Sequence, residues 1–316
     1  MSLKFIHLKN EAGLEVILCP LGASIYGIRF HGEWMTMTPV KEEDFARPEI
    51  YQGKTIGRTA NRIEGSLVKI DGKEYRLEAN ENGNTLHGGA HPLSARTFMY
   101  EKEEDEHEIR AVFQTVSPDG ESGFPGNLSV KVIYRLMKKE ATLYIEFEAE
   151  SDKPTLCNLT NHAYFTLGES DLSNLSLNLG ASTYIKTREE DLIPIEIAPI
   201  DEALDFRVPK LLLKDIAQVD KGKAKGYDHA FVFKPEDQKI LSLSSPRFQM
   251  TVETEFKAVQ IYTDNYPDGV AYHGTSLERR RGVAIEMQDD FSKRETLYPE
   301  TRYSRVIAYH FAQLHA

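Results

Sequence analysis

The feature of this sequence that most constrains its fold is an alternation of apolar and polar residues with a period of two. Across residues 128–136 every even position is apolar, and residues 142–149 repeat the pattern with apolar side chains at the odd positions. Such alternation is typical of β-strands that bury one face and expose the other. Residues 137–141 between them are few and mostly polar, so the two segments predict an antiparallel hairpin.

A second hairpin is predicted where Asp71-Gly72 joins residues 67–70 to residues 73–77, because Asp-Gly supplies the positive φ of a two-residue turn. Residues 248–256 alternate in the same way. Residues 209–217 alone have a helical pattern, and no succession of strands and helices argues for a parallel sheet. We therefore expect an all-β fold, a large antiparallel β-sandwich.

The chain has 316 residues, which exceeds a typical domain of ~150, but all-β sandwiches routinely pass ~200 residues. No long linker, fixed repeat or low-complexity tract divides it. We therefore predict a single domain over residues 1–316, long enough to bury a core without metal or disulfides. Cys19 and Cys157 lack a C-x-x-C spacing and are predicted to be small buried hydrophobic residues.

The charge balance excludes several classes of partner. Against 38 Lys and Arg stand 49 Asp and Glu, a net charge of −11, which repels nucleic acids. No window approaches ~18 consecutive apolar residues, and charges interrupt the apolar positions of residues 1–10, so neither a membrane span nor a secretory signal is predicted. We expect a cytoplasmic protein with no nucleic-acid or membrane partner.

Two short motifs suggest ligands but lack the spacing that binding requires. Residues 53–55 read Gly-Lys-Thr, yet a phosphate-binding loop needs a glycine five residues before its second glycine, where this chain has Pro48. His87 and His91 would face one metal ion on a helix, which the two glycines between them disfavour. We expect no metal site.

Polar residues that could take part in catalysis or ligand binding gather in residues 57–63, 84–89, 158–165 and 282–288. Each segment also has an ordinary explanation, as a solvated loop, a glycine turn or the polar face of a strand. In the last segment, strand alternation places Glu286 on the face opposite the apolar side chains. This placement alone is equally compatible with a solvent-exposed strand face and with a functional site.

Taken together, these segments resemble the aldose 1-epimerase (galactose mutarotase) family. The resemblance covers nearly the whole chain in family order and includes further motifs at residues 117–128, 227–229 and 260–263. It implies a galactose mutarotase-like supersandwich of large antiparallel sheets, in agreement with the alternation. It also implies an isomerase of carbohydrate and galactose metabolism that interconverts the α and β anomers of free hexoses such as galactose or glucose.

The resemblance implies residue roles as well. By similarity, His162 would be the general acid at the ring oxygen of the sugar, and Glu286 the general base at its anomeric hydroxyl. His87 is similar to a second active-site imidazole near the ring oxygen. Tyr164 lies in the same binding segment as His162, and the residues that match sugar-binding positions of the family are Asn61, Arg62, Asp228 and Gln260.

Exchange of anomers requires that the hemiacetal opens and recloses, with one proton leaving the anomeric hydroxyl while the ring oxygen gains one. One acid and one base suffice, so no cofactor, metal or covalent intermediate is expected. A carboxyl group near its reference pKa of ~4.3 and an imidazole near ~6.5 need only modest tuning to be ionised and protonated together.

Two other functions stay open. A hexose-6-phosphate 1-epimerase shares the fold and chemistry but needs cations for a dianion, and Arg58, Arg62 and Arg96 are available. A non-catalytic sugar-binding protein of the same fold would usually have lost its acid or base, whereas His162 and Glu286 are both present. The sequence also leaves open whether the chain is a monomer or a homodimer.

Overall fold

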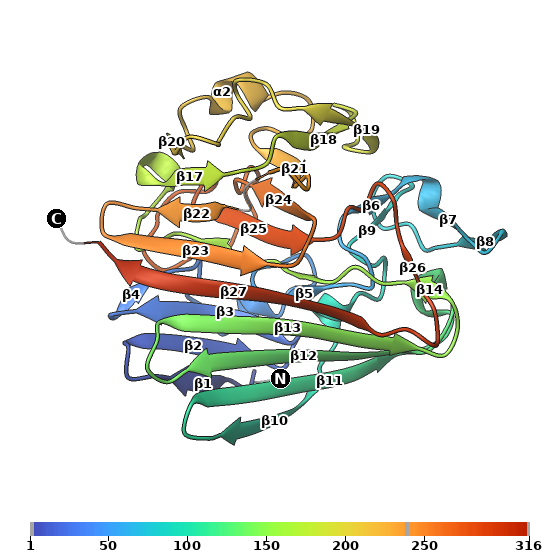
Figure 1. Ribbon diagram of the computed structural model, residues 1–316, viewed down its shortest axis with the longest axis horizontal. Coiled ribbons are helices and arrows are strands. Elements are labelled where there is room, and N and C mark those ends of the chain that lie inside the picture. The colour runs from blue at the N-terminus through green and yellow to red at the C-terminus, as the bar shows by residue number, and fades with distance from the viewer. Residues whose placement is uncertain (1–2, 238–239, 315–316) are drawn as a thin grey trace.

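The computed structural model describes residues 3–237 and 240–314 of the chain. Its largest element is a nine-stranded antiparallel sheet whose long strands run along the long axis of the molecule (Figure 1). In spatial order its strands are β10 (Met99–Glu104), β11 (Glu108–Ser117), β12 (Leu128–Met137), β13 (Thr142–Ser151), β27 (Tyr303–Gln313), β23 (Phe248–Thr254), β22 (Leu241–Ser244), β17 (Ser176–Leu179) and β20 (Lys210–Leu211).

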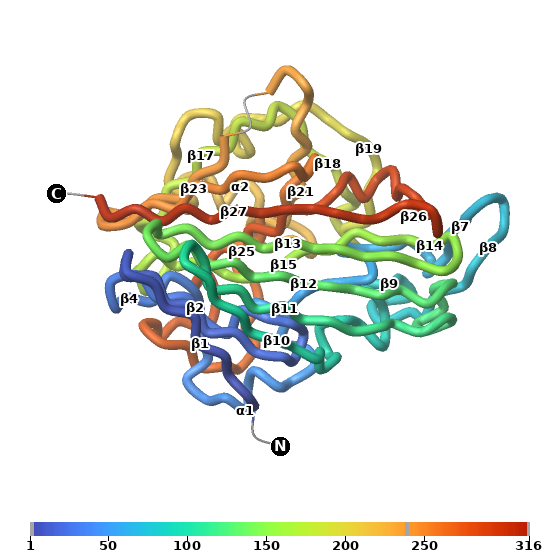
Figure 2. Tube along the Cα trace, turned by 60° about the horizontal axis from the view of Figure 1, so that its bottom comes forward, coloured from blue at the N-terminus to red at the C-terminus, as the bar shows by residue number. Residues whose placement is uncertain are grey.

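Two further sheets complete the main body. A six-stranded sheet has the order β16 (Tyr164–Phe165), β25 (Val283–Gln288), β24 (Ala258–Tyr262), β21 (Asp228–Val232), β18 (Thr183–Thr187) and β19 (Pro194–Pro199). A four-stranded sheet follows the chain through β1 (Ile6–Lys9), β2 (Leu14–Cys19), β3 (Ser24–Phe30) and β4 (Glu33–Trp34). Both views place β1 and β18 on opposite sides of the molecule (Figures 1 and 2).

Short strand pairs connect these sheets: β5 (Thr55–Ile56) with β15 (Thr160–Asn161), β6 (Arg62–Ile63) with β9 (Thr85–Leu86), β7 (Leu67–Ile70) with β8 (Lys73–Arg76), and β14 (Thr155–Leu156) with β26 (Thr296–Leu297). The helices are short: α1 (Glu42–Phe45), α2 (Ile216–Val219) and the 3₁₀ turns Glu64–Ser66, Leu93–Ala95, Glu121–Gly123 and Leu172–Asn174. Within the described ranges, no helix has the length and apolar character needed to cross a membrane.

The period-two alternation is what packs the large sheet onto the core. In the β12–β13 pair, Val132 lies opposite Phe147, and both side chains are fully buried. On the other face of the same pair, Lys131 lies opposite Glu148, and their charged groups are 3.7 Å apart. One continuous hydrophobic core draws buried side chains from all three large sheets. The predicted all-β antiparallel class is confirmed.

Local predictions are confirmed where the pattern is strong. The hairpin over residues 128–149 forms as β12 and β13, and Asp71-Gly72 joins β7 to β8. Cys19 and Cys157 are free and buried, as predicted.

The predicted helix over residues 209–217 is wrong. Residues 210–211 form β20 on the edge of the large sheet, and a helical turn begins only at Ile216. Leu212 and Ile216 are both buried in the core, and their separation of four residues is the spacing that suggested a helix. The open edge of β17 supplies the backbone partners that favour a strand instead.

Candidate active site

A pocket of about 320 Å³ collects all eight residues that the family resemblance selected. A cavity of this size lies at the lower end of the range for small-molecule sites, ~300–1,000 Å³. The eight are Asn61, Arg62, His87, His162, Tyr164, Asp228, Gln260 and Glu286. They come from strands or strand ends of the six-stranded sheet and of the short pairs, so segments 225 residues apart in the chain meet at one place.

The six-stranded sheet supplies the carboxylate side of the pocket. Glu286 on β25 lies directly opposite Gln260 on β24, so strand alternation points both side chains to one face. The amide nitrogen of Gln260 donates a hydrogen bond of 2.6 Å to Asp228 at the start of β21, and its amide oxygen accepts one of 2.9 Å from Asn61. Gln260 thereby fixes its two polar neighbours.

His162 is held by the segment that resembled a phosphate-binding loop. The backbone N–H of Gly53 donates to the carbonyl of His162, and the N–H of His162 donates to the carbonyl of Lys54, both at 3.0 Å. Gly53 has a φ of +65°, and a Cβ there would collide with the carbonyl oxygen of Ile25. Residues 53–55 therefore position an imidazole and bind no phosphate through their backbone.

His87 and Asn61 hold each other at the ends of the β6–β9 pair. Both have a left-handed backbone, with φ of +53° and +65°. The N–H of His87 donates to the carbonyl of Asn61, and the N–H of Asn61 donates to Nδ1 of His87 at 3.3 Å. A Cβ at Gly88 would collide with the carbonyl oxygen of Gly57. The glycines after His87 thus serve close backbone packing, where the sequence suggested approach to a ligand.

The two groups with expected proton-transfer roles lie together. Nε2 of His162 is 3.3 Å from Oε1 of Glu286, and the side chains are only 6% and 4% exposed. Burial raises the pKa of Glu286 well above its ordinary value, and burial lowers the pKa of His162 to about 4. The expectation of modest tuning is wrong, because both shifts favour the neutral forms, an imidazole beside a carboxylic acid.

His87 stays neutral and is a hydrogen-bond donor toward the pocket. Burial, followed by the nearby His162 and Arg62, lowers its pKa well below the ordinary value. Since Nδ1 accepts the hydrogen bond from Asn61, the neutral ring carries its proton on Nε2. The ring contacts Tyr51, with centroids 5.0 Å apart, and His162, with centroids 5.5 Å apart.

The cluster of His87, His162 and Glu286 brings potential metal-ligating atoms within 4.8 Å of one another. The surroundings do not suit a metal ion. A ligating imidazole normally donates its other ring N–H to an acceptor. Here Nδ1 of His87 faces an N–H donor, and Nδ1 of His162 finds no hydrogen-bond partner among the described residues. The geometry fits the expected proton-transfer roles better than it fits a metal site.

Of the three arginines considered for phosphate binding, only Arg62 reaches the pocket. Arg58 is buried elsewhere, where it donates to four backbone carbonyls and two hydroxyl groups. Arg96 forms an ion pair with Glu121. The interpretation of Arg58 and Arg96 as available cations is therefore wrong.

Sequence reasoning missed seven further lining residues: Tyr51, Glu81, Leu86, Leu192, Lys223, Tyr262 and Tyr266. Tyr262 stood within a quoted motif and could have been found by its position beside Gln260. Leu86 lies on β9, within the segment of residues 84–89 already singled out, and the remaining five residues lie in turns or loops of ordinary composition and carried no signal.

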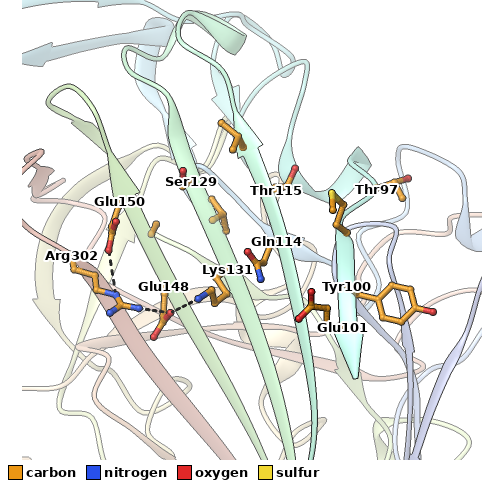
Figure 3. A pocket seen from close by; sticks show the side chains of 14 residues that line it. Thr97, Tyr100, Glu101, Gln114, Thr115, Ser129, Lys131, Glu148, Glu150 and Arg302 are labelled. Atoms are coloured by element: carbon orange, nitrogen blue, oxygen red, sulfur yellow. Dashed lines mark ion pairs between the residues drawn. The ribbon is translucent and has the colours of Figure 1, made fainter. Parts of the chain in front are cut away.

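A larger hollow, of about 710 Å³, lies on the outer face of β10 to β13 (Figure 3). Four of its charged groups pair with one another: Arg302 lies 2.5 Å from Glu148 and 3.7 Å from Glu150, and Lys131 lies 3.7 Å from Glu148. No imidazole lines it, and none of the eight predicted residues lies there. We assign the active site to the smaller pocket.

Comparison with known proteins identifies the family. The sequence profile of the aldose 1-epimerase family matches residues 4–310. The chain belongs to this family. It is 32% identical to the aldose 1-epimerase of Escherichia coli K12 over 303 residues, covering 90% of this chain and 86% of that protein. It is 34% identical to human galactose mutarotase over 259 residues, covering 78% of this chain and 72% of that protein.

The fold has close solved counterparts. The crystal structure of galactose 1-epimerase from Lactobacillus acidophilus NCFM superimposes with a TM-score of 0.90 at 28% identity, covering 100% of this chain and 96% of that one. A homologue from C. elegans superimposes with a TM-score of 0.87 at 24% identity, covering 99% of this chain and 100% of that one, which supports the fold. The predicted galactose mutarotase-like fold and the predicted class of isomerase, an aldose 1-epimerase, are confirmed.

Proposed function

We propose that this aldose 1-epimerase interconverts the α and β anomers of free hexoses such as galactose or glucose, with Glu286 as general base and His162 as general acid. The contact of 3.3 Å between Nε2 of His162 and Oε1 of Glu286 carries the proposal. The anomeric oxygen and the ring oxygen are both bonded to C1, so two groups this close can reach both oxygens at once.

Ring opening moves two protons and breaks one bond. Glu286 accepts the proton of the anomeric hydroxyl, and the C1–O1 bond becomes a carbonyl. The bond between C1 and the ring oxygen breaks, and the ring oxygen receives a proton from His162. Rotation about C1–C2 presents the other face of the aldehyde, and the reverse transfers then close the ring and restore both side chains.

The pair needs one proton in total. Burial favours the state in which Glu286 holds that proton, as the directions of the two pKa shifts show. The reactive state, with an imidazolium and a carboxylate, differs by transfer of this proton across the 3.3 Å contact. The pair is therefore competent at any pH at which it carries a single proton, whether that proton is on His162 or on Glu286.

The remaining side chains would hold the sugar. Nε2–H of His87 would donate to the ring oxygen, beside His162. Asp228 accepts from Gln260, and Asn61 donates to Gln260, so a connected set of polar groups faces the hydroxyls. The rings of Tyr51 and Tyr164 flank the imidazoles, which keeps water from the reacting groups.

Neither alternative function is favoured. Arg58 and Arg96 are engaged elsewhere, and Arg62 and Lys223, the cations among the described residues that line the pocket, both pair with Glu81, so neither is free for a sugar phosphate. A silent binding protein has no use for a buried pair of acid and base. The single domain over residues 1–316, which the shared core supports, the cytoplasmic location and the choice between monomer and homodimer stay predictions.

Polarimetry on freshly dissolved sugars tests the proposal. The chain should accelerate the decay of optical rotation of α-galactose or α-glucose far more than that of α-glucose 6-phosphate. Acceleration confined to the phosphate would support the hexose-6-phosphate enzyme. Sugar binding without any acceleration would support the non-catalytic protein.

A further inference from the structure

Glu81 joins the two cations of the active-site pocket. It accepts from Nε of Arg62 at 2.6 Å and from Nη2 of Arg62 at 3.2 Å. Its Oε1 also lies 2.8 Å from Nζ of Lys223, which lines the same pocket. The three side chains are between 11% and 24% exposed, so solvent screens their interaction only in part.

This contact decides the electrostatic character of the pocket. Among the described residues that line it, Arg62 and Lys223 are the two cations, and Glu81, Asp228 and Glu286 are the carboxyl groups. With the proton shared between His162 and Glu286, that pair is neutral. When Asp228 is ionised, Glu81 and Asp228 balance the two cations and the pocket has no net positive charge; burial raises the pKa of Asp228, whereas Glu81 contacts both cations directly.

We infer that Glu81 is a specificity-determining residue, which excludes phosphorylated hexoses by occupying Arg62 and Lys223. The inference rests on the proposed function and names its substrate class as uncharged sugars. A phosphate dianion entering the pocket would compete with Glu81 for both cations and lie close to its carboxylate. A neutral hexose meets no such repulsion, since its hydroxyls can accept from Arg62 while Glu81 remains in place.

Glu81→Gln tests this by removing the charge at nearly constant shape. We expect the ratio of kcat/KM for α-glucose 6-phosphate to that for α-glucose to rise at least about tenfold. Inorganic phosphate should also become a stronger competitive inhibitor of α-glucose mutarotation than it is for the unmodified chain. Adding Lys223→Met to Glu81→Gln should reverse much of both changes, because one of the released cations is gone.

Two control variants separate charge from structure. Glu81→Asp keeps the charge but shortens the side chain, so the ratio should stay low even if the rate falls. Glu78→Gln removes a half-exposed carboxylate from the same segment, 4.0 Å from the ring of His91 and outside the pocket, and should leave the ratio unchanged. A thermal melt of each variant reports its folding.

The outcomes are distinct. An unchanged ratio and unchanged phosphate inhibition in a folded Glu81→Gln variant would overturn the role of Glu81 while leaving the proposed function intact. An equal rise in Glu81→Asp or Glu78→Gln would overturn it as well, because the effect would then not follow the charge of this one group. An unmodified chain without activity on free hexoses would overturn the proposed function itself.

Discussion

Replacing Arg58 by Met should destabilise the protein strongly and leave sugar specificity alone. The guanidinium is 3% exposed and donates six hydrogen bonds of 2.9–3.2 Å. They end on the carbonyl oxygens of Ser117, Pro118, Pro125 and Gly126 and on the hydroxyls of Ser117 and Thr155. Met fills similar space, but it removes the guanidinium donor from all four carbonyls, of which that of Pro118 still accepts from the backbone N–H of Glu121 at 3.1 Å.

The magnitude follows from these bonds. An unpaired buried polar group costs ~1–3 kcal/mol, so the carbonyls of Ser117, Pro125 and Gly126 together would cost several times that amount if no other donor replaced Arg58. Part of the loss is offset because the charge no longer has to be buried, a cost visible in the pKa of Arg58, which burial lowers to about 10. We expect the free energy of unfolding to fall by about 3–5 kcal/mol, because several carbonyls lose a charged donor while the cost of burying that charge is removed.

Urea denaturation at neutral pH measures this change, with Arg302→Met as the matched control. The Arg302 side chain is 53% exposed and pairs with Glu148 on the surface, so its loss should cost under ~1 kcal/mol. KM for α-galactose should stay unchanged in folded Arg58→Met. If the free energy of unfolding of Arg58→Met decreased by less than ~1 kcal/mol, the assignment of Arg58 to the scaffold would be refuted. A raised KM in a variant of normal stability would refute it as well.

Three further results are expected. Asp228→Asn should raise KM for α-galactose in polarimetric assays more than it lowers kcat, because the carboxylate positions hydroxyls; unchanged constants would remove it from the site. Gly88→Ala should lower the melting temperature, since its Cβ would collide with the carbonyl oxygen of Gly57, and an unaltered melt would contradict that packing. Dialysis against EDTA should leave activity intact; loss that added zinc restores would show that His87, His162 and Glu286 hold a metal after all.

The fold could be predicted from the sequence wherever the pattern of apolar and polar residues depends on a single strand or turn alone. Residues 128–149 alternate because each strand buries one face, and Asp71-Gly72 has a turn preference of its own. Residues 209–217 failed because their spacing fits both a helix and a strand that packs on an edge. The available edge of β17 is a property of the whole fold, which no local pattern contains.

The same distinction applies to the site: some of its features could be predicted from local motifs, and others depend on the whole fold. The family motifs selected eight residues that the fold brings together, but their spacing alone gave no reason for His87 to meet His162. Glu81 and Lys223 lie in a turn and a loop where charged residues are ordinary, so only the folded structure reveals their contact. The large pKa shifts of the His162–Glu286 pair were equally hidden, because burial is set by segments distant in sequence.

The pH dependence of kcat/KM for α-galactose, in the unmodified chain and in Glu286→Gln, tests the central claim most directly. Because burial lowers the pKa of His162 to about 4 and raises that of Glu286 well above its ordinary value, the pair should hold a single proton over a pH range whose lower limit lies near 4 and whose upper limit is set by the raised pKa of Glu286. We predict a bell whose acidic limb lies near pH 4 and whose basic limb lies well above the ordinary pKa of a glutamic acid. Glu286→Gln should reduce the rate by ~10²–10⁴-fold and lose the acidic limb. A variant with a near-normal rate, or with an unshifted acidic limb, would contradict the assignment of Glu286 as the base.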